Sequence, residues 1–450
     1  MASGALSLWL LTQILSKEAI GGYLAMFSIT LLASLLATLG LDRALLLRIA
    51  PRPTRQGVLR GAGMWMRVTA VAILAGIVVA IGLNMLRLAF FPDSAVAQWM
   101  PVMSLAIPIA ATSLLLRSWF EANHRAATAH AMPGIVDASR CLLFVLLLFA
   151  GLGANTVAWC VVAAVSIPIF VLGILSSRQT RLIAPKHLTA GDFGSGAQRV
   201  VERMAMIGLF QIDLIIMGLL LVGSAMTAEY GIAARLAAFV GMGTNALDAP
   251  FAARARRYIV ANDIRGALHE FETARVSSLA VALTICSGVA VLGPFVLSLF
   301  GDYGGSFAPL LMISSSYIIL AAFGAQASFL AMTGEVTYSM ILRVVTIAVL
   351  TALLIYAIPR FGVFGAAASL LIAVTGMSIA GATLAARLTE LRVIDVHILI
   401  IAGISVVILW ATAFGHIGHL VCGAALACAA IWLIVSRWQV LVSLLRNVEV

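Results

Sequence analysis

The chain carries two opposite charges inside long apolar runs, and these charges are the first candidates for chemistry. Asp213 and Arg235 lie on either side of a turn near Val222–Ala228. Counted from that turn at about 1.5 Å per residue of helix, the two charges lie at similar depths in a bilayer. A charge at the centre of a bilayer costs about 2.5–3.5 kcal/mol on insertion scales, so an intramembrane pair is a hypothesis for a functional site.

Two roles compete for this pair. If Asp213 and Arg235 neutralise each other, they form a structural ion pair. If they act separately, the guanidinium of Arg235 offers a fork of donors that matches phosphate oxygens, and the carboxylate of Asp213 can carry H+ or Na+ as its surroundings change. Coupling to an H+ or Na+ gradient is therefore one expected outcome, and we expect no cofactor.

Other polar residues within or beside the apolar runs extend the candidates for a substrate or ion cavity. Arg67 either binds an anion or extends its guanidinium to the nearby inner interface. Asp42 and Arg43 form either a local ion pair or part of a site. Asn245 and Asp248 lie near the inner end of a predicted helix, where a helix cap or a loop contact is the alternative role.

Motifs of catalysis are missing from the sequence. It has no Walker motif for a built-in ATPase, and no GxSxG or paired acidic motif for a hydrolase or glycosyltransferase. His416 and His419 have the spacing of a metal pair, but no Asp, Glu or Cys lies beside them. The five cysteines lack CxxC spacing, and we expect them to be reduced apolar fillers. The sequence thus predicts neither an enzyme nor a metal site.

Membrane helices must position these candidates. With 62% apolar residues, 10% charged residues and a mean hydropathy of +1.10, the 450-residue chain has too little polar surface for a soluble globule. The predicted fold class is all-α, a polytopic membrane protein with about fourteen transmembrane helices. We place these spans at 2–16, 23–47, 61–90, 99–118, 134–152, 155–176, 201–222, 228–250, 276–300, 307–331, 337–358, 363–386, 397–414 and 420–437.

Lys and Arg concentrate on one side of these spans. When both termini are placed in the cytoplasm, about 22 basic residues fall in inner segments, as the positive-inside rule expects. Topology therefore accounts for most of the net charge of +10, and we expect no nucleic acid partner. The same ordering requires an even number of spans, about twelve or fourteen. Residues Arg254–Arg275 form either an ordinary inner loop or a site for anionic membrane lipid.

An internal repeat relates the two halves of the chain. Tyr23 and Asp42 in the first predicted hairpin recur as Tyr230 and Asp248, at offsets of 207 and 206 residues. An offset of six spans keeps both halves in the same orientation, so the repeat is parallel, about an axis along the membrane normal.

A second pair of similar segments supports the division of the chain into two repeated halves. The sequence FAGLGANTVAW at 149–159 matches PRFGVFGAAAS at 359–369. We predict three parts of the chain: a six-helix lobe at 1–190, a second six-helix lobe at 198–390, and an additional helix pair with a cytoplasmic tail at 395–450.

Three stretches carry a resemblance to a known family. They are LSKEAIGGYLAMFSITLLASLLATLGLDRALL at 15–46, QIDLIIMGLLLVGSAMTAEYGIAARLAAF at 211–239 and GEVTYSMILRVVTIAVLTALLIYAIPRFGVFGAAAS at 334–369. In order, they hold a Gly-x-Tyr turn, an Asp followed by Tyr-x-x-Ala, and a Gly-x-x-Gly-Ala helix entry. The chain resembles the polysaccharide flippases of the multidrug/oligosaccharidyl-lipid/polysaccharide exporter superfamily, in the O-antigen and teichoic-acid exporter branch.

The resemblance implies two lobes around a central cavity that faces each side of the membrane in turn. It implies movement of undecaprenyl-diphosphate-linked oligosaccharide from the cytoplasmic to the outer leaflet of the bacterial inner membrane, for lipopolysaccharide, O-antigen or exopolysaccharide synthesis. A polysaccharide polymerase and glycosyltransferases are the implied protein partners. In the family, helices one, two, seven and eight line the cavity. The first helix is short here, and Gln13 is its notable polar residue.

Two other functions stay open. A cation-coupled multidrug antiporter of the same superfamily is the first alternative. A carboxylate in the first helix would favour it, and this sequence has none there. A scaffold for a cell-wall or polysaccharide assembly complex, without transport, is the second.

Overall fold

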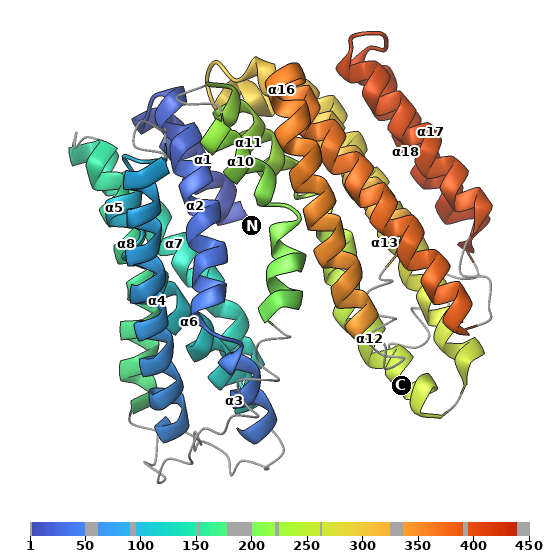
Figure 1. The fold of residues 1–450 in the computed structure, drawn as a ribbon. Helices are drawn as coiled ribbons and strands as arrows, with labels where there is room; N and C mark the ends of the chain where they lie inside the picture. Colours follow the sequence, from blue (N-terminus) through green and yellow to red (C-terminus); the bar gives the residue numbers. More distant parts are fainter. Residues whose placement is uncertain are drawn as a thin grey trace. The chain divides into compact units, whose positions relative to one another are not determined.

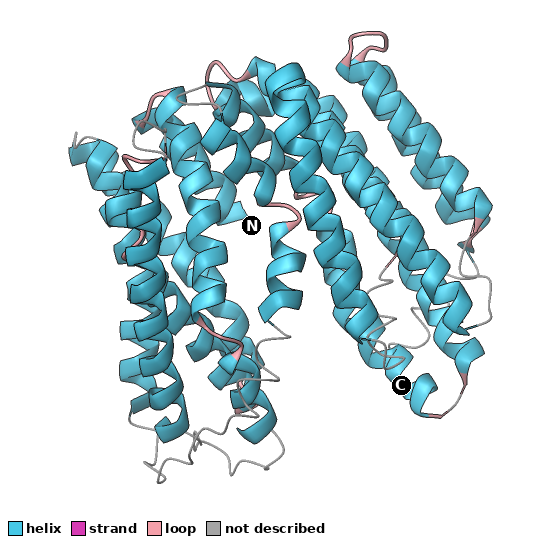
Figure 2. Ribbon diagram, in the orientation of Figure 1, coloured by secondary structure: helices cyan, strands magenta, loops and turns pink. Residues whose placement is uncertain are grey.

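The computed structural model describes residues 2–49, 62–90, 96–150, 154–177, 200–220, 225–261, 263–324, 336–389 and 395–438. The side chains of Arg43, Asn245 and Asp248 lie outside the described set. All regular structure in these ranges is helical (Figure 2). Contacts between residues divide the chain into two compact units, Met1–Ala228 and Glu229–Val450.

The first unit contains the helices drawn from blue to green in Figure 1. They are α1 (Ala2–Ile14), α2 (Lys17–Ala37), α3 (Leu41–Ile49), α4 (Ala62–Phe90), α5 (Met100–Met103), α6 (Ala106–Ala122), α7 (Ala126–Ala150), α8 (Ala154–Ser177), the helical segment Val200–Gly208, and α10 (Ile212–Leu220).

Helix α6 lies at the centre of the first unit. It packs against α2, α3, α4, α7 and α8, while α1 packs on α7 and α10 packs on α2. The side chains of Leu115, Leu116 and Trp119 on α6 are buried in this core. The indole of Trp119 stacks on that of Trp65 from α4, with ring centroids 5.4 Å apart. Aromatic and branched side chains therefore hold the helices of this unit together.

The helices of the second unit follow in chain order. Helix α11 (Ala225–Ala237) begins in the first unit and continues into the second. The others are α12 (Met242–Val260), α13 (Ile264–Leu299), the 3-10 helix η1 (Gly304–Ser306), α14 (Phe307–Phe323), α16 (Val336–Thr389), α17 (Val396–Ala413) and α18 (His419–Ser436). Helix α13 packs against α12, α14 and α18, and α14 also packs against α16 and α17.

Helix α16 consists of two arms joined at Gly362. This residue has φ 58° and ψ −131°, a conformation that glycine adopts without a Cβ penalty. Side chains from both arms line one groove, so the arms lie side by side (Figure 1). The predicted turn at 359–362 and the two predicted spans around it are therefore present as a helical hairpin.

Asp395 ties the last helix pair to α13. Its carboxylate caps α17 by accepting a hydrogen bond from the amide of His397 at 3.0 Å. The same carboxylate forms an ion pair with Arg437 after α18, and its Oδ2 lies 4.0 Å from Nη2 of Arg275 on α13. One side chain therefore joins the start of α17 and the end of α18 to α13 at Arg275.

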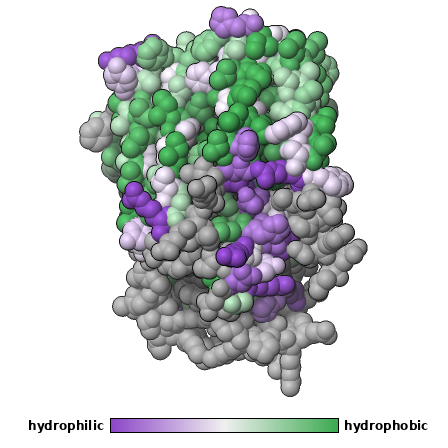
Figure 3. Space-filling model, turned by 90° about the vertical axis from the view of Figure 1, so that its right-hand side faces the viewer, coloured by the Kyte–Doolittle hydropathy of each residue, from purple (hydrophilic) through white to green (hydrophobic). Residues whose placement is uncertain are grey.

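The described helices have the lengths and compositions of membrane spans. Nine are long and apolar enough to cross a bilayer, or ten with the bent pair Val200–Gly208 and Ile212–Leu220. The span Thr337–Arg387 contains both arms of α16, and two shorter apolar helices, Gly4–Ile14 and Thr156–Leu172, are also present. Figure 3 shows hydrophobic side chains over the upper part of one face, with hydrophilic ones gathered lower down. The protein is thus an all-α, multi-pass membrane protein, as predicted, and these helices are compatible with fourteen spans.

Candidate functional site

Three spans that were predicted as continuous helices are broken in the structure. Residues 38–40 separate α2 from α3, residues 209–211 separate Val200–Gly208 from α10, and residues 238–241 separate α11 from α12. The second break bends the chain by 65°. Hydropathy detects an apolar run but not a bend within it, so these breaks were not predicted. Several of the predicted in-span charges lie beside them.

Asp213 is the second residue of α10, directly after the bend. Its side chain is 1% exposed, and its Oδ1 accepts a hydrogen bond from the amide of Leu214 at 2.8 Å. The first turn of a helix has amides without intrahelical partners, and it carries the positive end of the helix dipole. This position stabilises a carboxylate by about 0.3–1 kcal/mol, and by more when it is partly buried. A helix end therefore accommodates the buried charge of Asp213.

A hydrogen bond fastens the bend to α2. The hydroxyl of Ser28 on α2 donates to Oε1 of Gln211 at 2.7 Å. The backbones of α2 and α10 also approach closely, because a Cβ added to Gly218 would collide with Cβ of Ala25. The sequence did not reveal this contact of Gln211 with α2.

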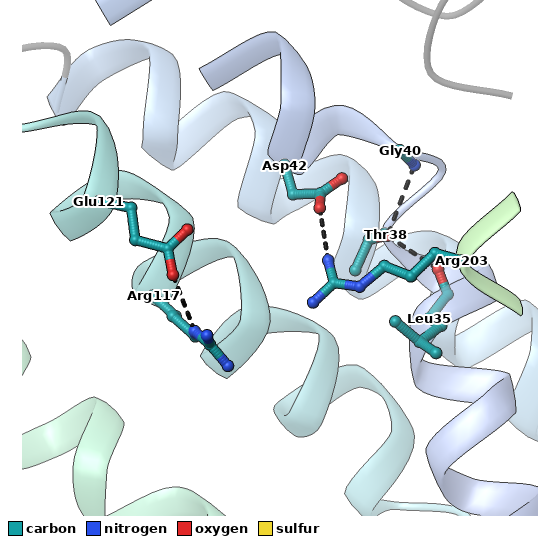
Figure 4. A network of polar contacts seen from close by, with 7 residues as sticks. All are labelled: Leu35, Thr38, Gly40, Asp42, Arg117, Glu121 and Arg203. Atoms are coloured by element: carbon teal, nitrogen blue, oxygen red, sulfur yellow. Dashed lines mark hydrogen bonds and ion pairs between the residues drawn. The ribbon is translucent and has the colours of Figure 1, made fainter. Parts of the chain in front are cut away.

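Asp42 is the second residue of α3, directly after the break in the second span. Its Oδ2 accepts a hydrogen bond from Nη1 of Arg203 at 2.7 Å, an ion pair that joins residues 161 positions apart (Figure 4). The preceding turn has positive φ at Leu39 (50°) and Gly40 (69°). The sequence offered Arg43 as the local partner of Asp42. Arg203 is the partner that the described residues show.

Arg235 lies in the last turn of α11 and is half-buried. A helix carries a partial negative charge at its C-terminus, so this end stabilises a guanidinium. Arg235 belongs to the second compact unit and Asp213 to the first. Neither side chain is free of interactions. Their mutual pairing stays a prediction.

The remaining candidates are spread over both units. Arg67 is the sixth residue of α4 and half-buried, and no described residue forms an ion pair or hydrogen bond with it. Gln13 on α1 is exposed, and its amide donates to the hydroxyl of Thr12 at 3.4 Å. Asn245 and Asp248 are on α12, with side chains outside the described set. Their roles in a cavity stay predictions.

One intramembrane ion pair was not predicted from the sequence. Nη2 of Arg140 donates to Oδ1 of Asp137 at 2.7 Å, and both residues lie well inside the span Ala127–Ala150 of α7. The guanidinium also lies 5.3 Å from the ring centroid of Phe27 on α2. The side chains of Arg140 and Asp137 are 11% and 26% exposed. This pair is therefore a further candidate for the site.

The missed pair has a simple cause. The span was predicted to begin at residue 134, which placed Arg140 near an inner loop, whereas α7 begins at Ala126. The intervening sequence AATAHAMP is only weakly apolar, so hydropathy did not extend the span. The spacing Asp-x-x-Arg places both side chains on one helix face, and it could have indicated this ion pair in the sequence.

No grouping of three or more His, Cys, Asp or Glu side chains with metal-binding geometry occurs within the described part of the chain. His419, one member of the predicted HxxH spacing, instead packs its ring edge-to-face on Phe307 with centroids 6.4 Å apart. The polar side chains described in the spans include carboxylates, guanidinium groups, amides and hydroxyls. Such groups bind anions or monovalent cations and exchange protons.

Residues 3–237 match the family described as "Polysaccharide biosynthesis protein". This match covers more than half of the chain, and the chain belongs to that family. No curated protein matches the sequence.

Several solved structures share the fold of the chain. The lipid II flippase MurJ in an inward closed conformation has a TM-score of 0.69 at 12% identity, over 97% of this chain and 97% of its own. An inward-facing multidrug resistance MATE family transporter of the MOP superfamily has a TM-score of 0.65 at 14% identity, over 86% of this chain and 94% of its own. The MATE multidrug transporter DinF-BH has a TM-score of 0.62 at 14% identity, over 86% of this chain and 91% of its own. The chain shares the fold of these proteins.

Proposed function

We propose that the protein is a flippase that moves undecaprenyl-diphosphate-linked oligosaccharide from the cytoplasmic to the outer leaflet by alternating access. The product would enter lipopolysaccharide, O-antigen or exopolysaccharide synthesis. The observation that carries the proposal is the family match over 3–237, together with the fold shared with a lipid II flippase. Both point to a lipid-linked saccharide as the cargo.

Arg140 supports this proposal at the level of chemistry. A diphosphate in a partly dehydrated site needs guanidinium donors, because their geometry matches phosphate oxygens. Arg140 lies inside a span, and Asp137 and Phe27 hold its guanidinium in place. Its buried Nε has no hydrogen-bond partner among the described residues. We assign Arg140 a role in binding the diphosphate, beside the candidates Arg67 and Arg235.

Transfer of a lipid-linked oligosaccharide across proteoliposomes tests the proposal. Loss of one charge-assisted contact of about 1.5–3 kcal/mol predicts at least about a tenfold slower transfer for Arg140→Ala. Arg140→Lys should recover part of the rate because it restores the charge without the fork. Arg117→Ala is the matched control, since Arg117 forms an i,i+4 pair with Glu121 on α6 and is 30% exposed.

If Arg140→Ala transfers the lipid-linked oligosaccharide at the wild-type rate, Arg140 does not bind the diphosphate. Absence of transfer with every lipid-linked oligosaccharide, alongside exchange of a cationic drug for H+ or Na+, would replace the flippase by the second candidate. That candidate is a cation-coupled multidrug antiporter. The carboxylates of Asp213 and Asp137 within spans favour it, as does the fold shared with MATE transporters.

The cellular setting belongs to the same proposal. We place the protein in the bacterial inner membrane with both termini in the cytoplasm. Its parts would be the lobes at 1–190 and 198–390 and the helix pair at 395–450. A polysaccharide polymerase and glycosyltransferases would supply and consume its cargo. Dependence of transfer on an imposed H+ or Na+ gradient would identify the coupling ion.

A further inference from the structure

The two arms of α16 enclose an apolar groove of about 360 Å³. Residues from both arms form its walls: Ile341, Leu342, Val345, Ala380, Thr383 and Leu384. The single hydroxyl in these walls, on Thr383, donates to the carbonyl of Ala380 at 2.9 Å. The walls therefore offer no unused hydrogen-bond donor, and they suit a hydrocarbon chain.

Two polar side chains close one end of the groove. Tyr338 lies 24 residues before Gly362, and Arg387 lies 25 residues after it. At about 1.5 Å per residue, both lie roughly 36–38 Å from the kink. A hydrocarbon core is about 30 Å thick, so a hairpin that spans it brings these side chains to the level of the lipid headgroups. Tyr and Arg are the residue types expected at that level.

The state of Arg387 differs from that of Arg360 at the other end of the same hairpin. The guanidinium of Arg360 lies 3.9 Å from the ring centroid of Tyr356 and donates to the Tyr356 carbonyl at 2.9 Å. Arg387 is exposed, and no described residue forms an ion pair or hydrogen bond with it. Its charge is therefore available to an anion at the mouth of the groove.

We propose that this groove is a binding site for an anionic phospholipid. One acyl chain lies between the arms of α16, and the phosphate accepts hydrogen bonds from Arg387 and from the hydroxyl of Tyr338. The apolar walls match the chain, and the guanidinium of Arg387 at the mouth matches the negative headgroup. The site stands apart from transport, so it does not rest on the proposed cargo.

Native mass spectrometry of the purified full-length protein tests the site, with phosphatidylglycerol and phosphatidylethanolamine as probes. Wild-type protein should retain one phosphatidylglycerol in preference to phosphatidylethanolamine. Arg387→Gln should reduce that preference by about fivefold, the effect of one cation at a membrane surface, and Arg387→Lys should restore most of it. Val345→Trp should fill the groove and abolish retention, while Arg360→Gln should behave as wild type.

Several results would overturn the assignment. Equal retention of both lipids by the wild type would show that no anionic site exists. Retention unchanged in both Arg387→Gln and Val345→Trp would place the lipid elsewhere, and an equal loss in Arg360→Gln would show an unspecific effect of charge. Displacement of phosphatidylglycerol by an equal concentration of a polyprenyl phosphate would replace the phospholipid by that lipid.

Discussion

Three charged residues of the spans, Asp213, Asp42 and Arg235, each lie in the terminal turn of a helix. The sequence did not reveal these helix ends. Asp213 and Asp42 lie in the first turn of α10 and α3, and Arg235 lies in the last turn of α11. Each sign is the one that the adjacent helix end stabilises. A break in a span thus lowers the cost of a charge at that depth. The same ends keep backbone groups available to a ligand.

The charge at Asp213 gives a prediction at the scale of one residue. Asp213→Asn should fold, since the amide oxygen still accepts from the Leu214 amide, but transport should fall if the carboxylate carries the coupling ion. Exchanging the charges, with Asp213→Arg and Arg235→Asp, places each charge at the wrong helix end. We expect the exchange to lower the free energy of unfolding by about 1–2 kcal/mol relative to the wild type.

Thermal unfolding and transport in proteoliposomes provide the two measurements. Arg117→Ala, which removes one charge of the i,i+4 pair with Glu121 on α6, serves as the control for handling and reconstitution. If the exchanged protein transports at the wild-type rate, the two residues form a structural pair only.

Sequence reasoning at this scale proposed some of the polar residues that the structure places within spans, and it overlooked others. Asp213 and Arg235 were found because a charge in a long apolar run is conspicuous. Arg140 was missed because its span begins in weakly apolar sequence, and the contact of Gln211 was missed because hydropathy does not report on hydrogen bonds. The partnership of Asp42 with Arg203 depends on contact between distant segments, which one sequence without comparison does not contain.

At the scale of helices, length and composition were predictable and continuity was not. The spans were located because each needs about 20 apolar residues to cross the bilayer. The breaks depend on tertiary contacts, such as the hydrogen bond from Ser28 to Gln211. At residues 38–40 a local cause is also present, since Leu39 and Gly40 have positive φ. Such conformations are ordinary for Gly and uncommon for Leu. Gly40 is therefore compatible with a break at this point, whereas Leu39 gives no sign of one.

Close approach of two helices gives a prediction at this scale. Gly218→Ala adds a methyl group that collides with Cβ of Ala25, so α10 must move away from α2. Overpacking of this kind costs about 1–3 kcal/mol, which should appear as a lower midpoint of thermal unfolding. Gly82→Ala on α4 is the matched control, because nothing lies within 4 Å of the added Cβ.

An unchanged midpoint for Gly218→Ala would mean that the contact between α2 and α10 relaxes without cost. A fall of equal size in Gly82→Ala would point instead to a general effect of the exchange of glycine for alanine within these spans.

At the scale of the whole molecule, the fold class followed from the sequence, and the division into lobes stays a prediction. The predicted lobes start from the repeat, with the second beginning at residue 198. The contacts instead keep Val200–Gly208 and α10 with the first unit, because Arg203 pairs with Asp42 and α10 packs on α2. A repeat describes descent and orientation, whereas a compact unit describes packing. The two divisions therefore need not coincide.

The number of spans gives a prediction for the whole chain. An even number, such as fourteen, places both termini on the same side, and the distribution of Lys and Arg makes that side the cytoplasm. Tags at both ends should be protected from a membrane-impermeant reagent in intact cells. A cysteine that replaces exposed Asp302, in the connection between α13 and α14, should react as the outer control. Reaction of one terminal tag would require an odd number of spans.

The hydroxyl of Ser28 has two acceptors within reach, Oε1 of Gln211 at 2.7 Å and the carbonyl of Leu24 on its own helix at 3.1 Å. A buried donor that loses its only partner raises the free energy by about 1–3 kcal/mol. Here the Ser28 hydroxyl can still donate to the Leu24 carbonyl if its hydrogen bond to Gln211 is lost, so Ser28 itself adds no such penalty. The hydrogen bond between α2 and the bend therefore fixes the position of the bend, while its loss would leave the Ser28 hydroxyl with a hydrogen-bond partner on its own helix.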